Sequence, residues 1–117
     1  MQYLLQMTYR PDDNTKEGTP EFEAEMQRWH ALNDELKAAG HYIGASGLTP
    51  DATTVRKTAD GEVTVTDGPY AETKEVFFSF YLLDVPDLDA AIAVAAKTPA
   101  SEYGSVEIRP LVGFEPA

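Results

Sequence analysis

The chain has 117 residues, of which 43% are hydrophobic and 10% aromatic, so we expect one globular domain over residues 1–117. It has no cysteine, which excludes disulfides, thiolate catalysis and cysteine-ligated metal centres. Its 20 acidic and 9 basic residues give a formal charge of −11, which opposes direct binding to nucleic acid or to anionic membranes. We find neither a signal-peptide pattern nor an apolar stretch of the ~20 residues that a membrane span needs, so the expected location is the cytoplasm.

The first part of the chain carries the signals of a strand, a helix and a second strand. Residues 2–9 alternate between two sets of side chains, which predicts a strand, and residues 10–18 are rich in loop formers. Thr19 is a suitable N-cap with Pro20 at the first helical position, and apolar residues recur every three or four positions up to Gly40, which ends the predicted helix. A second extended stretch begins at 41–45.

The second part predicts a hairpin, a buried strand, a helix and a final strand. Runs at 53–57 and 62–66 flank an Asp-Gly pair typical of a tight turn, and residues 67–75 are expected to leave this ladder at Gly68-Pro69. Residues 76–83 are apolar on both faces, which indicates a strand covered on both sides. Asp87 caps a second helix that Pro99 stops, and 106–112 forms the last strand, with Pro110 at an edge, a bulge or the strand's end.

The order β-α-β-β-β-α-β is typical of an α+β fold, specifically a ferredoxin-like sandwich with an inserted β-hairpin. Two helices can cover only one face of such a sheet. A second copy packed sheet to sheet is the simplest cover for the other face, so we expect a homodimer formed through the sheet face.

The segment from Thr66 to Glu75, TDGPYAETKE, resembles the signature of DGPF proteins, a branch of the YCII-related family. The resemblance implies a ferredoxin-like fold that pairs as a dimeric α/β barrel. It implies no defined activity: some YCII-related proteins are suspected enzymes with a helix-borne histidine near an acidic residue, and DGPF proteins often accompany extracytoplasmic-function sigma factors. Tyr70 departs from the signature, which carries Phe there. Similar stretches occur elsewhere in the chain, at 38–40, 46–48, 52–56, 84–89 and 104–110.

His30 and Asp67 are the candidate catalytic residues. His30 lies seventeen positions before Gly47, approximately where the suspected histidine of YCII-related proteins sits, and imidazole suits proton transfer at neutral pH. The alternative for His30 is an exposed helix pair with Asp34, one turn later. Asp67 is either a base or polar anchor at the rim of a cleft, or the residue that holds the following turn through an Asx bond. His41, after the terminal glycine, is interpreted as a helix cap.

The candidate ligand-binding residues come from the motif and from the sheet. In the motif, Tyr70 would stack on a ligand while Glu72 and Lys74 contribute charge. Arg109 would anchor a carboxylate or phosphate, unless it simply forms a salt bridge with Glu107. The polar residues that alternation could place on the inner sheet face are Gln6, Thr8, Ser79, Tyr81 and Arg109.

Two functions remain open. Two histidines eleven residues apart, without cysteine, predict no metal site, and the absence of phosphate-binding and G-x-S-x-G motifs predicts no nucleotide cofactor and no serine nucleophile. The first function is a small dimeric ligand-binding or enzyme-like protein with a cleft near the 67–74 loop. The second is a non-catalytic module that binds a protein partner in sigma-factor-dependent transcription, which predicts a filled interior and no pocket.

Overall fold

The computed structural model of the chain describes residues 1–10, 18–68 and 75–117. The predicted loop at 10–18 therefore lies, apart from its two end residues, outside the described residues. In chain order the elements are β1 (Gln2–Tyr9), α1 (Pro20–Ala38), β2 (Tyr42–Gly47), β3 (Thr53–Lys57), β4 (Val63–Asp67), β5 (Val76–Asp84), α2 (Leu88–Lys97), α3 (Ala100–Tyr103) and β6 (Gly104–Pro110).

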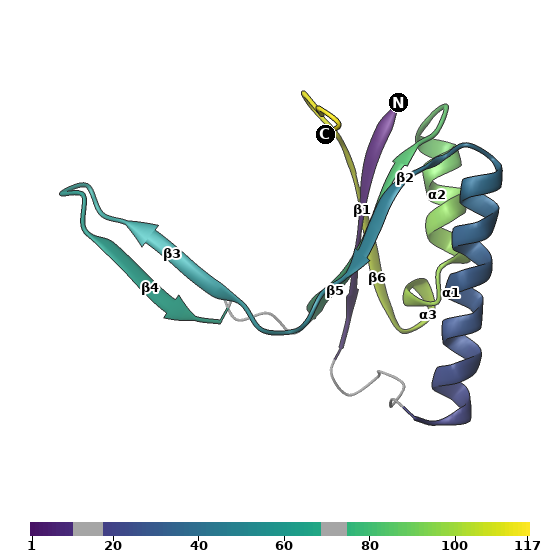
Figure 1. Cartoon of the computed structure of the whole chain (residues 1–117), viewed down its shortest axis with the longest axis horizontal. Coiled ribbons are helices and arrows are strands. Elements are labelled where there is room, and N and C mark those ends of the chain that lie inside the picture. Colours follow the sequence, from purple (N-terminus) through teal and green to yellow (C-terminus); the bar gives the residue numbers. More distant parts are fainter. Residues whose placement is uncertain (11–17, 69–74) are drawn as a thin grey trace.

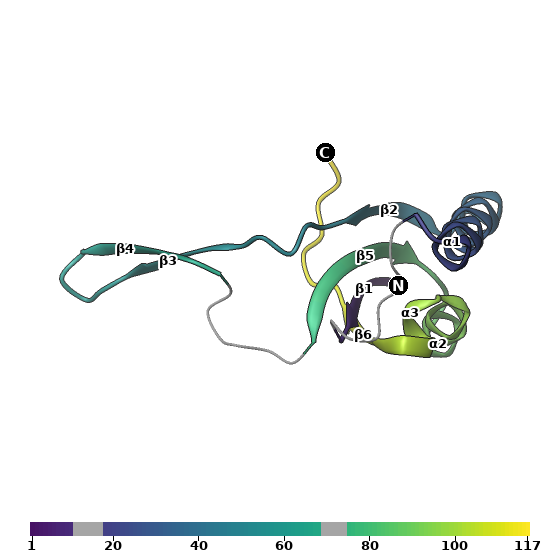
Figure 2. The same cartoon turned by 90° about the horizontal axis from the view of Figure 1, so that it is seen from below.

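Four strands form the main sheet in the order β2-β5-β1-β6, and every neighbouring pair is antiparallel. All three helices lie on one face of this sheet, while β3 and β4 form a separate two-stranded ribbon that projects away from the other side (Figures 1 and 2). The architecture is therefore the predicted α+β type, with an antiparallel sheet and one helical layer.

The core lies between the sheet and the helices. In β1 the buried residues Tyr3, Leu5 and Met7 alternate with half-buried ones. This face of the strand therefore packs against the helical layer. Leu5 and Leu83 are fully buried, and each contributes about 1.5–3 kcal/mol to the free energy of unfolding by removing its side chain from water.

The ends of α1 follow the sequence signals. The Thr19 hydroxyl accepts a hydrogen bond from the Phe22 N–H at 3.1 Å, and Pro20 occupies the first turn. At the other end Gly40 has a φ of +76°, which ends the helix as predicted. Among the described residues, no helix combines the length and the apolar character that crossing a membrane requires.

The region after α2 differs from the prediction of one helix followed by a strand at 106–112. A separate short helix, α3, follows Pro99, and β6 begins at Gly104 and ends at Pro110, which is thus at the strand's end. The cause is local: the Thr98 hydroxyl donates to the Ala95 carbonyl at 2.8 Å and accepts from the Ser101 N–H at 3.3 Å, so the chain ends one helix and starts another within a few residues.

The β3–β4 hairpin forms as predicted, with one difference at its end. Asp67 was expected to have left the ladder, but it is the last residue of β4 and pairs with Thr53. Val55 pairs with Val65, and both are more than 60% exposed in the single chain. With Val63 two positions before Val65, the hairpin has one apolar face that nothing in the described single chain covers.

We predict that Gly104→Ala destabilises the protein. A Cβ at this position would lie 1.9 Å from the Thr8 carbonyl oxygen, which is backbone and cannot move aside, so the loss should be about 1–3 kcal/mol or more. The matched control is Gly44→Ala, because a Cβ there meets nothing within 4 Å. Urea unfolding followed by circular dichroism measures both variants, and equal stability of the two would contradict the close β1–β6 approach.

Candidate functional site

The sheet face opposite the helices carries polar residues that the single chain leaves accessible. Since Leu5 and Met7 point to the helices, Gln6 lies on the opposite face, beside Glu107 of β6 and Phe80 of β5. Leu4, next along this face, pairs with Arg109 and Leu82. We call this surface the open face.

A cleft of about 840 Å³ lies at one end of the open face. Part of its wall comes from the segment after β2, including Leu48 and Asp51, and part from the start of β5, with Val76 and Phe77. Its described charged lining is wholly acidic, consisting of Asp51, Glu75 and Glu107. The cleft therefore combines apolar walls with carboxylates and favours a neutral or cationic group of a ligand.

Glu75 is the carboxylate most firmly held in the cleft. Its Oε2 lies 3.1 Å from the hydroxyl oxygens of both Thr8 and Ser105, and these two hydroxyls lie 2.8 Å from each other. Thr8 is only 9% exposed. The two hydroxyl protons serve three short contacts, so the donors are shared between the carboxylate and the neighbouring hydroxyl. We call these three residues the Glu75 cluster.

The strand register brings the cluster together. Thr8 and Ser105 are directly opposite on β1 and β6. Between Met7 and Thr8 the pairing of β1 with β5 shifts, so that Met7 pairs with Ser79 but Thr8 pairs with Phe77. Such a bulge bends a strand and re-aims its side chains, and here it sets Thr8 beside the start of β5, where Glu75 enters the sheet.

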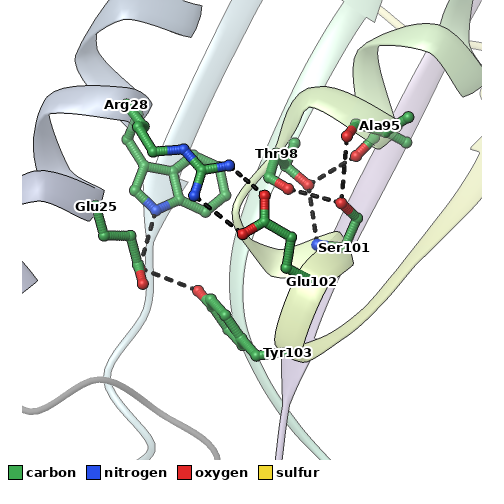
Figure 3. Close-up of polar contacts among 9 residues, drawn as sticks. Glu25, Arg28, Ala95, Thr98, Ser101, Glu102 and Tyr103 are labelled. Atoms are coloured by element: carbon green, nitrogen blue, oxygen red, sulfur yellow. Dashed lines mark hydrogen bonds and ion pairs between the residues drawn. The ribbon is translucent and has the colours of Figure 1, made fainter. Parts of the chain in front are cut away.

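A polar network between α1 and α3 fixes the start of β6 and hence Ser105 (Figure 3). Glu25 accepts hydrogen bonds from the Trp29 indole at 3.2 Å and from the Tyr103 hydroxyl at 3.1 Å. Arg28 forms a two-pronged ion pair with Glu102, one arm of which is 3.0 Å long. The hydrogen bond from Arg28 holds the pKa of Glu102 below its ordinary value, although both side chains are exposed and such pairs are weak individually.

A second, smaller cavity of about 530 Å³ adjoins the cleft at the same carboxylate. It is lined by Arg10, Glu75, Glu102, Tyr103 and Gly104. Burial and the nearby Glu25 carboxylate raise the pKa of Tyr103 above its ordinary value, so its hydroxyl remains a donor at neutral pH. Glu75 is the described residue common to both cavities.

The structure does not bring the two candidate catalytic residues together. Helix α1 lies on the helix-covered side of the sheet (Figure 1). His30 is exposed on this helix and lines neither cavity among the described residues. Asp67 is exposed at the end of β4, in the hairpin, and its side chain makes no Asx bond within the described residues. The two candidates therefore lie on different parts of the fold, His30 on α1 and Asp67 in the β3–β4 hairpin.

The candidate ligand-binding residues fall in three places. Tyr70, Glu72 and Lys74 lie outside the described residues. Tyr81 was expected on the inner sheet face, but it is 2% exposed and its hydroxyl donates to Asn33 of α1, because the alternation of β5 places it with Leu83 on the helix-covered face. Arg109 is exposed on the open face, opposite Leu4, and pairs with Glu107 at 3.2 Å, the salt bridge that was its alternative.

Neither Glu75 nor Ser105 was predicted from the sequence as a site residue, although the fold joins both to Thr8. Glu75 is the last residue of the TDGPYAETKE motif, so its position was a usable signal. Ser105 lies in the family-like stretch 104–110, but the apolar pattern gave no signal for it, because β6 begins earlier than that pattern indicates. Among the described residues we find no group of three histidine or acidic side chains placed to hold a metal ion.

Comparison with known proteins identifies the family. The chain belongs to the YCII-related domain family, whose model matches residues 1–115, as the motif predicted. An uncharacterised protein of Rhizobium meliloti (strain 1021) is 38% identical over 100 residues, which are 82% of this chain and 80% of that protein. The 5-chloro-2-hydroxyhydroquinone dehydrochlorinase of Burkholderia phenoliruptrix AC1100, solved with 2,5-dihydroxybenzoquinone, matches with a TM-score of 0.50 and 13% identity over 96% of this chain and 94% of that one. The likeness to this enzyme shows a shared fold.

We predict that the buried Tyr81 makes stability fall at alkaline pH. Burial raises its pKa to about 12 from 10.0, with a smaller contribution from Tyr42, so the folded protein keeps a proton that the unfolded chain loses. The free energy of unfolding should therefore decrease as the pH rises from about 10 to about 12. Tyr81→Phe should make this decrease smaller, leaving the part that comes from the raised pKa of Tyr103, whereas Phe78→Leu, a change to a neighbouring core ring without a titrating group, should leave the slope unchanged. Urea unfolding at several alkaline pH values measures the slope, and an identical slope in Tyr81→Phe would contradict the assignment.

Proposed function

We propose that this chain is a small-molecule-binding, enzyme-like protein whose binding site is the cleft on the open face. The proposal rests on one observation. Two hydroxyls hold the Glu75 carboxylate at the wall of a cleft of about 840 Å³ that also has apolar walls. Cavities that bind small molecules commonly measure about 300–1,000 Å³ and present a few fixed polar groups on apolar walls.

The chemistry of Glu75 suggests what it does to a ligand. A carboxylate whose orientation is fixed accepts a strong hydrogen bond from a hydroxyl or amine, and the same atom can take a proton as a general base. The neighbouring Thr8 and Ser105 hydroxyls can change the acceptor to which they donate when a ligand arrives, which lets the cluster adjust without moving the backbone. Glu75 is thus the group we propose for ligand recognition and for any proton transfer.

The acidic lining argues against the expected anion anchor in this cleft. Arg109 is outside the described lining and its guanidinium is already paired with Glu107. An anionic group placed among Asp51, Glu75 and Glu107 would meet like charge. We therefore propose that the part of the ligand inside the cleft is neutral or cationic and carries a hydrogen-bond donor.

The cleft favours this proposal over the regulatory module. A protein that acts only by binding a transcription partner was expected to have a filled interior and no pocket, and its partner would use an exposed apolar or acidic surface. The described residues instead line an open cleft with a built polar cluster.

We also propose a ferredoxin-like sandwich that pairs as a homodimer through the open face. The strand order β2-β5-β1-β6 with one helical layer supports this finer description of the fold. Phe80 and Leu82 lie on the open face and remain partly exposed in the single chain. The valine face of the hairpin needs cover as well, because an isolated two-stranded hairpin is marginally stable in water. A second copy supplies cover for both surfaces.

Binding to the cleft is testable with 1-phenylpropan-2-ol, which joins a benzene ring to one hydroxyl. We expect Glu75→Gln to weaken its binding about fivefold, because a hydrogen bond to a carboxylate is about 1 kcal/mol stronger than one to an amide. Glu107→Gln, a matched change in the same cleft, should alter affinity less than about twofold. Ligand-observed NMR on the full chain gives the dissociation constants, and equal effects of the two variants would contradict the role of Glu75.

For the homodimer, we predict that light scattering gives twice the chain mass of 12.8 kDa at micromolar concentration. Leu82→Glu places a charge on the open face and should shift the mass toward a single chain. Ile92→Glu is the matched control, since Ile92 is an exposed apolar residue of α2 in the helical layer, and it should stay dimeric. A monomer mass for the unmodified chain would contradict the proposed pairing.

A further inference from the structure

The two cavities meet at Glu75, and this shared position constrains what one ligand can look like. The larger cavity offers apolar walls from Val76 and Phe77, and the smaller one is lined mainly by polar groups. A ligand whose hydroxyl donates to Glu75 can therefore extend in two directions from that hydroxyl. One direction favours an apolar body and the other favours a polar or charged group.

Arg10 indicates which charge the polar group of the ligand carries in the smaller cavity. Among the described residues that line the two cavities, Arg10 is the one basic residue. Within the described part of the chain, its guanidinium makes no hydrogen bond or ion pair. In contrast, Arg28 is paired with Glu102 and Arg109 with Glu107. Glu102 also lines the smaller cavity, but its charge is offset by Arg28. The Arg10 guanidinium is thus the group placed to bind an anion, and its forked donors match a carboxylate.

We propose that the site takes a small 2-hydroxy carboxylate with an apolar body, a deepening that rests on the proposed function. The apolar body lies in the cleft against Phe77, the hydroxyl donates to Glu75, and the carboxylate binds Arg10 in the smaller cavity. The proposal places hydroxyl and carboxylate on neighbouring carbons, because Glu75 and Arg10 line the same smaller cavity, whereas Val76 and Phe77 line the cleft.

The charged residues that line the cleft differ from those that line the smaller cavity. Asp51 and Glu107 line the cleft but not the smaller cavity, and Arg10 lines only the smaller cavity, so the carboxylate of the ligand is favoured beside Arg10 and the ligand takes one orientation. Tyr103 lines the smaller cavity as well, and its hydroxyl is fixed by Glu25 in the α1–α3 network. The wall next to Arg10 is therefore held in place by the same contacts that position Ser105.

Three probe molecules separate the contributions of the hydroxyl and the carboxylate to binding. 3-Phenyllactate carries the apolar ring, the hydroxyl and the carboxylate; 1-phenylpropan-2-ol replaces the carboxylate by a methyl group; 3-phenylpropionate lacks the hydroxyl. With the full chain, we expect 3-phenyllactate to bind about tenfold more tightly than either of the other two, as a charged hydrogen bond of about 1.5 kcal/mol gives. The affinity of 3-phenyllactate should fall with increasing salt, and that of the alcohol should not.

Variants of two arginines complete the test. Arg10→Gln should weaken 3-phenyllactate about tenfold and leave 1-phenylpropan-2-ol within about twofold. Arg109→Gln, the matched control on the open face, should change neither. If the alcohol binds in a Glu75-dependent way but 3-phenyllactate binds no more tightly, or Arg10→Gln has no effect, the Arg10 subsite is wrong while the cleft stands. If neither the alcohol nor 3-phenyllactate binds, the proposed function itself fails.

Discussion

The close pairing of β1 with β6 at their Thr8–Ser105 end is the constraint on which the site depends. Gly104 permits it, because the Thr8 carbonyl occupies the space where a side chain would begin. This approach sets two hydroxyls 2.8 Å apart. A bulge in β5, where Phe78 has no partner in β1, then brings the start of β5 alongside, so that Glu75 meets both hydroxyls. Backbone geometry thus builds the polar cluster before any ligand is present.

The two faces of the sheet have different roles. The helix-covered face holds the core, with Leu5 and Leu83 fully buried, and the α1–α3 network holds the start of β6 from that side. The open face carries the cleft and the partly exposed residues Phe80 and Leu82. Stability comes from one face and recognition is proposed for the other, so changes in the cleft need not disturb the core.

Local patterns predicted most of the elements, while the site required contacts between distant segments. The Thr19 cap, the Gly40 terminus and the Asp60-Gly61 hairpin are local signals, and all three formed as predicted. Tyr81 was misplaced because a run that is apolar on both faces does not say which face the helices cover. Ser105 was missed because its partners, Thr8 and Glu75, are 97 and 30 positions away, and spacing along the chain carries no such information.

The most direct measurement of the central claim is an amide NMR titration of the 15N-labelled full chain with 1-phenylpropan-2-ol. Binding at the Glu75 cluster predicts shift changes concentrated at Thr8, Glu75 to Phe77 and Ser105, with the amides around His30 on α1 unaffected. Shift changes centred on His30, or scattered evenly over both faces of the sheet, would contradict a binding site built around Glu75.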